Sequence, residues 1–172
     1  MRFHAITVFP RWRPALAALI TALLVAGCGF QLRGQSTLPF ETLHVAGATP
    51  MLVELKRNVA AGTQTKLVEQ VAGAAAIFEI VAEAREKVIL SLDTAGRVRE
   101  YQLRYRVGFR VHDGKGQSWI PTSEIVLTRD ISFNDAQIIA KENEEALLYR
   151  DMQTDMVQQI VRRLARAQRS GA

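Results

Sequence analysis

The chain has 172 residues, of which 48% are apolar, a size and composition that suit one domain with a real core and exclude a disordered chain. Its net charge of +5 is unevenly placed: three arginines in residues 1–27 and four in 162–169, both stretches without acids, leave 15 basic and 17 acidic residues in 28–161, a net charge of −2. A general nucleic-acid-binding surface is therefore excluded.

Residues 1–27 have the layout of a secretory signal peptide. Arg11 and Arg13 precede an apolar run of 11 residues, 15–25. That run is shorter than the ~20 residues a transmembrane helix needs. The exit reads Val-Ala-Gly before Cys28, which resembles the lipobox of bacterial lipoproteins, where the cysteine sulfur takes a diacylglycerol. The sequence therefore predicts a lipid anchor.

The lipobox resemblance assigns a role to the single cysteine of the chain. If Cys28 is acylated, the mature chain has no thiol left for a disulfide. Gly29 comes next, where inner-membrane retention usually uses Asp, so the resemblance implies the outer membrane. Residues 28–40 are expected to form the lipidated N-terminus and a tether, 41–169 a single α+β domain, and 170–172 a tail.

The first elements of the domain are short. A strand is expected over 42–46, and Thr49 followed by Pro50 predicts a helix start, with the threonine as N-cap. The helix is expected to end at Gly62, and an edge strand is expected over 66–69. The predicted apolar stripe of the helix is Leu52, Leu55 and Val59.

Period-two alternation predicts a long β-hairpin over 76–111. In 76–92 the even-numbered positions are apolar except at Glu86, and in 101–111 the odd-numbered positions are apolar. The turn 93–96 between them ends in glycine. These patterns place the apolar residues of both strands on one face.

A hairpin that pairs Leu92 with Arg97 fixes the register of the remaining residues. It leaves Arg85 opposite Arg104, and like charges directly opposite destabilise a sheet. The other pairs it predicts are Ile80 with Phe109, Ala82 with Val107, Glu79 with Arg110, and Glu83 with Arg106.

A third long strand is expected over 117–133, where Pro121 indicates a bulge or an edge position. A helix then runs from Asp135, its expected N-cap, to about Ala167. Its predicted apolar face is Ile139, Ala146, Tyr149, Met156, Ile160 and Leu164. The element order predicts an α+β two-layer sandwich, with two helices packed on one face of a mostly antiparallel sheet.

Catalytic chemistry has no support in the sequence. His44 and His112 stand alone, no metal-type cluster or phosphate-binding loop is present, and Cys28 is assigned to lipid. We therefore expect no enzyme activity, metal or cofactor. The hairpin instead has seven basic and three acidic residues over 85–110, and multivalent phosphate is the natural partner for such an excess. A solvated sheet face is the alternative.

Four segments resemble the LptE family of lipopolysaccharide-assembly lipoproteins. They are Gly-Cys-Gly-Phe-Gln-Leu-Arg at 27–33, Glu-Tyr-Gln-Leu at 100–103, Ala-Lys-Glu-Asn-Glu-Glu at 140–145 and Val-Arg-Arg-Leu at 161–164. They occur in the family's order and cover the mature chain. The resemblance implies two helices on a four-stranded sheet.

The resemblance also implies a function. The chain is expected to plug and help assemble the large β-barrel LptD and to bind lipopolysaccharide for delivery to the outer leaflet. Lys141 falls on a family position implicated in this binding, whereas the second such position is Thr94 here, with Arg97 or Arg99 as the substitute. The candidate lipopolysaccharide-binding residues are Arg97, Arg99, Lys141, Arg85, Lys87 and Arg104. A subunit of another envelope lipid-transport or secretion complex is the alternative; a lipid-anchored hydrolase lacks a nucleophile–base pair.

Overall fold

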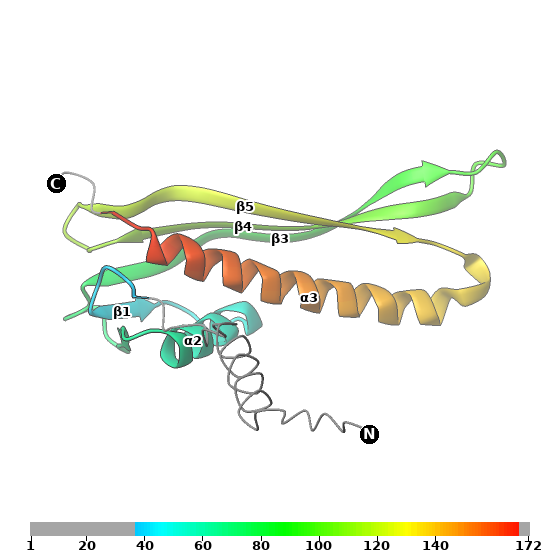
Figure 1. The fold of residues 1–172 in the computed structure, drawn as a ribbon. Helices are drawn as coiled ribbons and strands as arrows, with labels where there is room; N and C mark the ends of the chain where they lie inside the picture. The colour runs from blue at the N-terminus through cyan, green and yellow to red at the C-terminus, as the bar shows by residue number, and fades with distance from the viewer. Residues whose placement is uncertain (1–36, 169–172) are drawn as a thin grey trace, which may run out of the picture. The chain divides into compact units, whose positions relative to one another are not determined.

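The computed structural model describes residues 37–168 as two helices on one face of a five-stranded sheet (Figure 1). The predicted signal peptide, Cys28 and the C-terminal tail lie outside the described residues. The elements are β1 (Thr42–Val45), α2 (Pro50–Gly62), β2 (Lys66–Leu67), β3 (Ala76–Leu92), β4 (Val98–His112), β5 (Ser118–Ser132), a 3-10 turn η1 (Asp135–Gln137) and α3 (Ile138–Ala165).

The sheet has the strand order β2-β1-β3-β4-β5 and is mixed. Strand β1 runs parallel to both of its neighbours, whereas β3, β4 and β5 are antiparallel. The predicted α+β two-layer class is confirmed. The four strands implied by the resemblance are one too few, because the edge strand expected over 66–69 does form, as the two-residue β2 that pairs in parallel with β1.

Helix α2 begins as its sequence predicts. The Thr49 hydroxyl accepts a hydrogen bond from the Leu52 amide at 3.4 Å, and Pro50 is the first helical residue. At the other end Gly62 is the last helical residue, and the hydroxyl of Thr63 donates to the Val59 carbonyl at 2.7 Å. The predicted stripe is buried together with Met51.

The core lies between the carboxyl half of α3 and the proximal half of the sheet, where β1 and α2 lie. Phe78 and Phe109 stack there with ring centroids 5.4 Å apart. The buried residues of α3 are all in its second half: Met152, Met156, Val157, Ile160 and Leu164. Ile139 was predicted on the apolar face but is 77% exposed, and Asn134, not Asp135, caps the start of η1.

The predicted hairpin exists, and its register is right up to Ile80. Ile80 pairs with Phe109 and Glu79 with Arg110, as expected. A register shift then leaves Val81 as an extra residue of β3. The predictions beyond it were wrong by one residue: Ala82 pairs with Gly108, Glu83 with Val107, Ala84 with Arg106 and Arg85 with Tyr105.

The shift at Val81 changes which side chains of β3 face the helices. Directly paired residues share a face of the sheet. Because Glu83 and Arg85 pair with the buried Val107 and Tyr105, they face α3. The apolar residues that follow the shift, Ala82, Ala84 and Val88, therefore lie on the outer face.

Strand β5 forms one edge of the sheet. The predicted irregularity at Pro121 is confirmed by a register shift between the pairs Phe109–Ser123 and Val111–Ile120. Arginine side chains cover two carbonyl groups of this strand: Arg163 Nη1 donates to Glu124 O at 3.2 Å, and Arg129 Nη1 donates to Thr128 O at 2.9 Å. Such contacts reduce what an edge strand offers to another chain.

Candidate functional site

The distal end of the sheet, where the β3–β4 turn lies and α3 begins (Figure 1), gathers several of the candidate cations. The Phe133 amide donates to Arg99 O at 2.7 Å, which joins β4 to the segment before η1. Lys141 Nζ donates to the Ser132 hydroxyl at 3.0 Å, and Lys87 Nζ lies 5.9 Å from the Phe133 ring centroid. We call Lys87, Arg97, Arg99 and Lys141 the distal cluster.

A cavity of about 330 Å³ opens in this region. Its lining residues are Asp93, Arg97, Val98, Arg99, Phe133 and Asn134. Two arginines, one aromatic ring and one amide are therefore available to a ligand with both charged and apolar parts.

Arg97 is exposed and is paired with Asp93 in the turn that precedes it. Its Nη2 lies 2.9 Å from Asp93 Oδ2, and its side chain is 72% exposed. Asp93 accepts hydrogen bonds from the backbone amides of Arg97 and Ala95, both at 2.9 Å. These bonds, the one from Arg97 foremost, lower the pKa of the Asp93 carboxyl below its ordinary value of 3.8. The carboxylate thus shapes the turn and orients Arg97.

Arg99 differs from every other member of the distal cluster. Its side chain has no ion pair or hydrogen-bond partner within residues 37–168, and the residue is exposed. A register shift between the pairs Ser91–Glu100 and Leu92–Val98 leaves Arg99 as an extra residue of β4. Bulges of this kind aim a side chain away from its regular direction.

The two lysines of the cluster are already engaged by α3. Lys87 Nζ lies 2.6 Å from Glu145 Oε2 and 4.4 Å from the ring centroid of Tyr101. Lys141 Nζ lies 2.9 Å from Glu144 Oε2, and its side chain is only 16% exposed. Lys87 therefore ties the amino half of α3 to the sheet through Glu145, and Lys141 does so through its hydrogen bond to Ser132. Both lysines are less accessible than Arg97 and Arg99.

Arg85 is part of the contact between β3 and α3. Its guanidinium lies 4.9 Å from the ring centroid of Tyr105 and 5.5 Å from that of Tyr149, and it donates to Gln153 at 3.0 Å. Tyr105 donates to Glu83 at 2.6 Å. Burial, followed by the hydrogen bond to Glu83, raises the pKa of the Tyr105 hydroxyl.

Arg104 lies on the opposite face of the sheet from Arg85. It pairs with Glu86, and its Nε donates to Gln102 Oε1 at 2.9 Å. The prediction that Arg85 and Arg104 oppose each other in one basic patch was therefore wrong. The extra residue Val81 shifts the register by one, so that Arg85 pairs with Tyr105 and the two arginines lie on different faces of the sheet. Of the six candidates, four form the distal cluster. Arg85 instead joins β3 to α3, and Arg104 lies on the outer face of the sheet.

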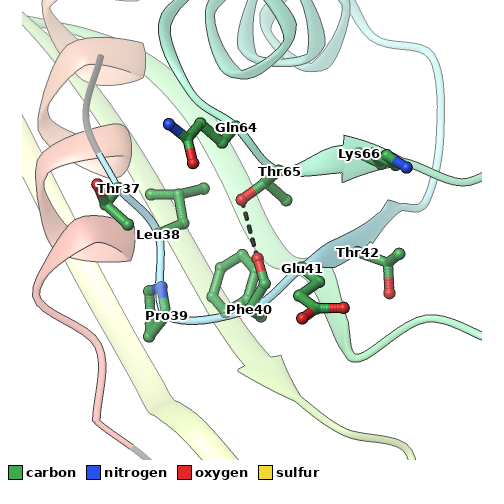
Figure 2. Close-up of a pocket in the computed structure, with 9 residues that line it drawn as sticks. All are labelled: Thr37, Leu38, Pro39, Phe40, Glu41, Thr42, Gln64, Thr65 and Lys66. Carbon is green, nitrogen blue, oxygen red and sulfur yellow. Dashed lines mark hydrogen bonds between the residues drawn. The ribbon is translucent and has the colours of Figure 1, made fainter. Parts of the chain in front are cut away.

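A second cavity, of about 460 Å³, lies where the chain enters the sheet (Figure 2). It is formed by residues 37–42 and 64–66, with the Thr65 hydroxyl donating to Phe40 O at 2.9 Å. Leu38 and Phe40 are buried beside it, which fixes the start of the domain against the core. None of the predicted site residues line this cavity.

The described part of the chain offers neither a metal-type cluster nor a helix suited to a bilayer. Residues 37–168 bring together no group of three or more His, Cys, Asp or Glu side chains that could hold a metal ion. Within the same range, neither helix combines the length and apolar character needed to cross a membrane.

These features define a two-layer α+β domain whose candidate site is a cationic sheet end. A family model described as lipopolysaccharide-assembly, LptE, matches residues 40–164. The chain therefore belongs to the LptE family, as its four short motifs predicted. Members of this family are non-catalytic, which confirms the prediction that the chain is not an enzyme.

Individual relatives agree with this membership. The LPS-assembly lipoprotein LptE of Photorhabdus laumondii is 24% identical over 149 residues, which are 84% of this chain and 81% of that protein. The solution structure of lipoprotein B from Nitrosomonas europaea is 44% identical, with a TM-score of 0.68 over 78% of this chain and 88% of that one. Rare lipoprotein B from Shewanella oneidensis, at 23% identity, a TM-score of 0.62 and coverage of 72% and 93%, shows the shared fold alone.

Proposed function

We propose that this chain is a lipoprotein of the outer membrane, anchored through acylated Cys28 and facing the periplasm and a barrel lumen. In this proposal it plugs and helps assemble the LptD β-barrel and binds lipopolysaccharide for delivery to the outer leaflet. Family membership supports the assembly role. The observation that carries ligand binding is the unpaired, bulged Arg99 beside the exposed Arg97, within residues 37–168.

The phosphates of lipid A are suited to these two arginines. A guanidinium donates bidentate, charge-assisted hydrogen bonds to phosphate. Solvent screens an exposed ion pair such as Arg97–Asp93, so Arg97 loses little free energy when it exchanges the carboxylate for a phosphate. Lys87, paired with Glu145, and Lys141, bonded to Ser132, hold the start of α3 beside the arginines and add positive potential.

Charge-matched variants test the ligand. The double variant R97A/R99A is expected to lower affinity for lipopolysaccharide at least about tenfold, because a hydrogen bond between charged groups contributes ~1.5–3 kcal/mol. The control R57A/R162A removes two exposed cations from α2 and the carboxyl end of α3 and should leave affinity unchanged. Equal losses in both variants would indicate nonspecific attraction. No loss in either would favour another envelope complex.

Separate experiments test the anchor and the barrel. Cys28→Ser should move the protein out of the membrane fraction, and metabolic labelling with a fatty acid should then fail. A large β-barrel should co-purify with the native protein after detergent extraction. Recovery of the chain alone from such extracts contradicts the plug. A photo-crosslinker at position 97 or 99 should capture lipopolysaccharide in cells.

A further inference from the structure

The tip of the β3–β4 hairpin exposes an unusual amount of apolar surface. Val88, Ile89, Leu90 and Leu92 are 39%, 57%, 47% and 55% exposed. The first three are consecutive, so both faces of the strand are apolar here, whereas a half-buried strand alternates. A run of three exposed apolar residues lowers the solubility of a protein, and such a surface usually marks a site that binds a lipid or another protein.

The apolar tip is not alone at this end of the molecule. Ile138 and Ile139, at the start of α3, are 47% and 77% exposed. They lie at the same end of the sheet as the hairpin turn (Figure 1). Exposed apolar side chains thus flank the distal cluster on two sides, from the hairpin and from the helix.

The strand pairing brings apolar and cationic side chains to the same few rungs of the ladder. Between the pairs Ile89–Tyr101 and Ser91–Glu100, Leu90 is an extra residue of β3. One rung further on, Arg99 is the extra residue of β4. At these two adjacent irregularities, the side chains of Leu90 and Arg99 depart from the regular alternation between the two faces of the sheet.

We propose that the hairpin tip, residues 88–92, inserts among the acyl chains of the lipid whose phosphates Arg97 and Arg99 hold. Charge complementarity supports this insertion: cations that border an exposed apolar surface fit an anionic lipid layer, in which phosphates lie next to hydrocarbon. The inference rests on the proposed lipopolysaccharide binding for the identity of that lipid. An apolar protein surface would also cover the hairpin tip, but it would supply no anionic partner for Arg99.

A depth-sensitive probe tests the insertion. The full-length lipidated protein carries Leu90→Cys labelled with an environment-sensitive fluorophore; Cys28, the only native cysteine, is acylated in this form and does not react. Val126→Cys is the matched control, since Val126 is 45% exposed on β5 against 47% for Leu90. Both labelled proteins are added to phosphatidylcholine vesicles with and without lipid A, and quenching by lipids spin-labelled on their acyl chains is measured.

We expect quenching at position 90 to be at least about threefold stronger than at position 126, and only in vesicles that contain lipid A. Equal quenching at both positions would overturn the proposal, because the common lipid anchor would then explain it. So would a probe at position 90 that is shielded from water in the barrel complex yet not quenched, since a protein wall would then be the occupant.

Affinity measurements separate this inference from the proposed function. The variant I89S/L90S keeps every cation, its substitutions are exposed, and it should fold. Its affinity for lipopolysaccharide should fall at least about tenfold, since burial of two apolar side chains is lost. Unchanged affinity overturns insertion while lipopolysaccharide binding stands. Conversely, if R97A/R99A binds normally and the probe at position 90 is still quenched, insertion stands and the phosphate role of the arginines fails.

Discussion

The amino half of α3 is expected to open independently of the rest of the domain. No residue from Ile138 to Asp151 is buried, whereas the second half of the helix supplies five buried residues to the core. The first half is held instead by polar contacts, one with Ser132 at the end of β5 and the others with β3. Tyr149 donates to Glu86 O at 2.7 Å, and Lys87 lies 2.6 Å from Glu145. These contacts can be removed without creating a cavity.

The conservative double variant E145Q/Y149F removes the charge of the ion pair and the hydroxyl that bonds Glu86 O, and it keeps helix propensity and side-chain volume. A net hydrogen bond is worth ~1 kcal/mol, and an ion pair whose side chains are 36% and 24% exposed adds at most about 1 kcal/mol after solvent screening. If the two add, the local opening free energy falls by about 2 kcal/mol. That corresponds to amide exchange about 30-fold faster.

Hydrogen exchange measured along the helix is the assay. Amides of residues 142–149 should accelerate in the double variant, and amides of 153–164 should keep the rate of the unchanged protein. Met156→Ala is the contrasting control, because it truncates a fully buried side chain and should lower global stability by ~2–5 kcal/mol, with faster exchange throughout. Uniform acceleration in E145Q/Y149F, or none, would refute a separately opening half-helix.

Three further predictions concern the stability of the domain. The hydrogen bond from Arg110 holds the pKa of Glu79 below its ordinary value of 4.5. The stabilisation that Glu79 contributes is therefore present above pH 4.5 and is lost as the pH falls through the lowered pKa. In denaturant titrations, the difference in stability between the native protein and E79Q should shrink on acidification. Gly47→Ala should cost ~1 kcal/mol or more, because φ is +97° and a Cβ would lie 2.9 Å from Leu52 Cδ1; an unchanged melting temperature would contradict this. Phe109→Ala should cost ~3–5 kcal/mol and Val126→Ala less than about 0.5, so comparable losses would contradict the assigned core.

Elements with a strong local signal were predictable from the sequence. The N-cap and stripe of α2, the long hairpin and the irregularity at Pro121 all arise from short-range patterns. The two-residue β2 does form, but its parallel pairing depends on contacts with β1 that no local pattern encodes. The edge strand expected over 66–69 is therefore present but shorter than expected.

The register beyond Ile80 could not be predicted, because the favoured face of β3 depends on a helix far along the chain. Apolar alternation placed Ala82 and Ala84 toward the core. In the structure, Glu83 and Arg85 take that face, where a tyrosine and a glutamine satisfy them. Polar partners 22 and 68 residues away outweigh a run of small apolar side chains that have little area to bury.

The sequence singled out the candidate cations but did not predict how the structure arranges them. Arg97, Arg99 and Lys141 come together at the distal end, whereas Arg104 lies on the other face. The exposed tip was missed, although the run Val88-Ile89-Leu90 breaks the alternation and was visible in the sequence. The exposed tip was not recognised because the apolar residues of 76–92 were all assigned to one face of the hairpin.

The arginines that occupy carbonyl groups of β5 have a consequence for the proposed partnership with a barrel. A barrel that is still folding contains unpaired strands. An open edge strand of 15 residues, such as β5, could pair with one of them and so compete with the closure of the barrel. With Glu124 O and Thr128 O already engaged, β5 is a poor template for such recruitment. If the chain assists a barrel as proposed, we therefore expect it to remain a separate protein and not to add a strand to that barrel.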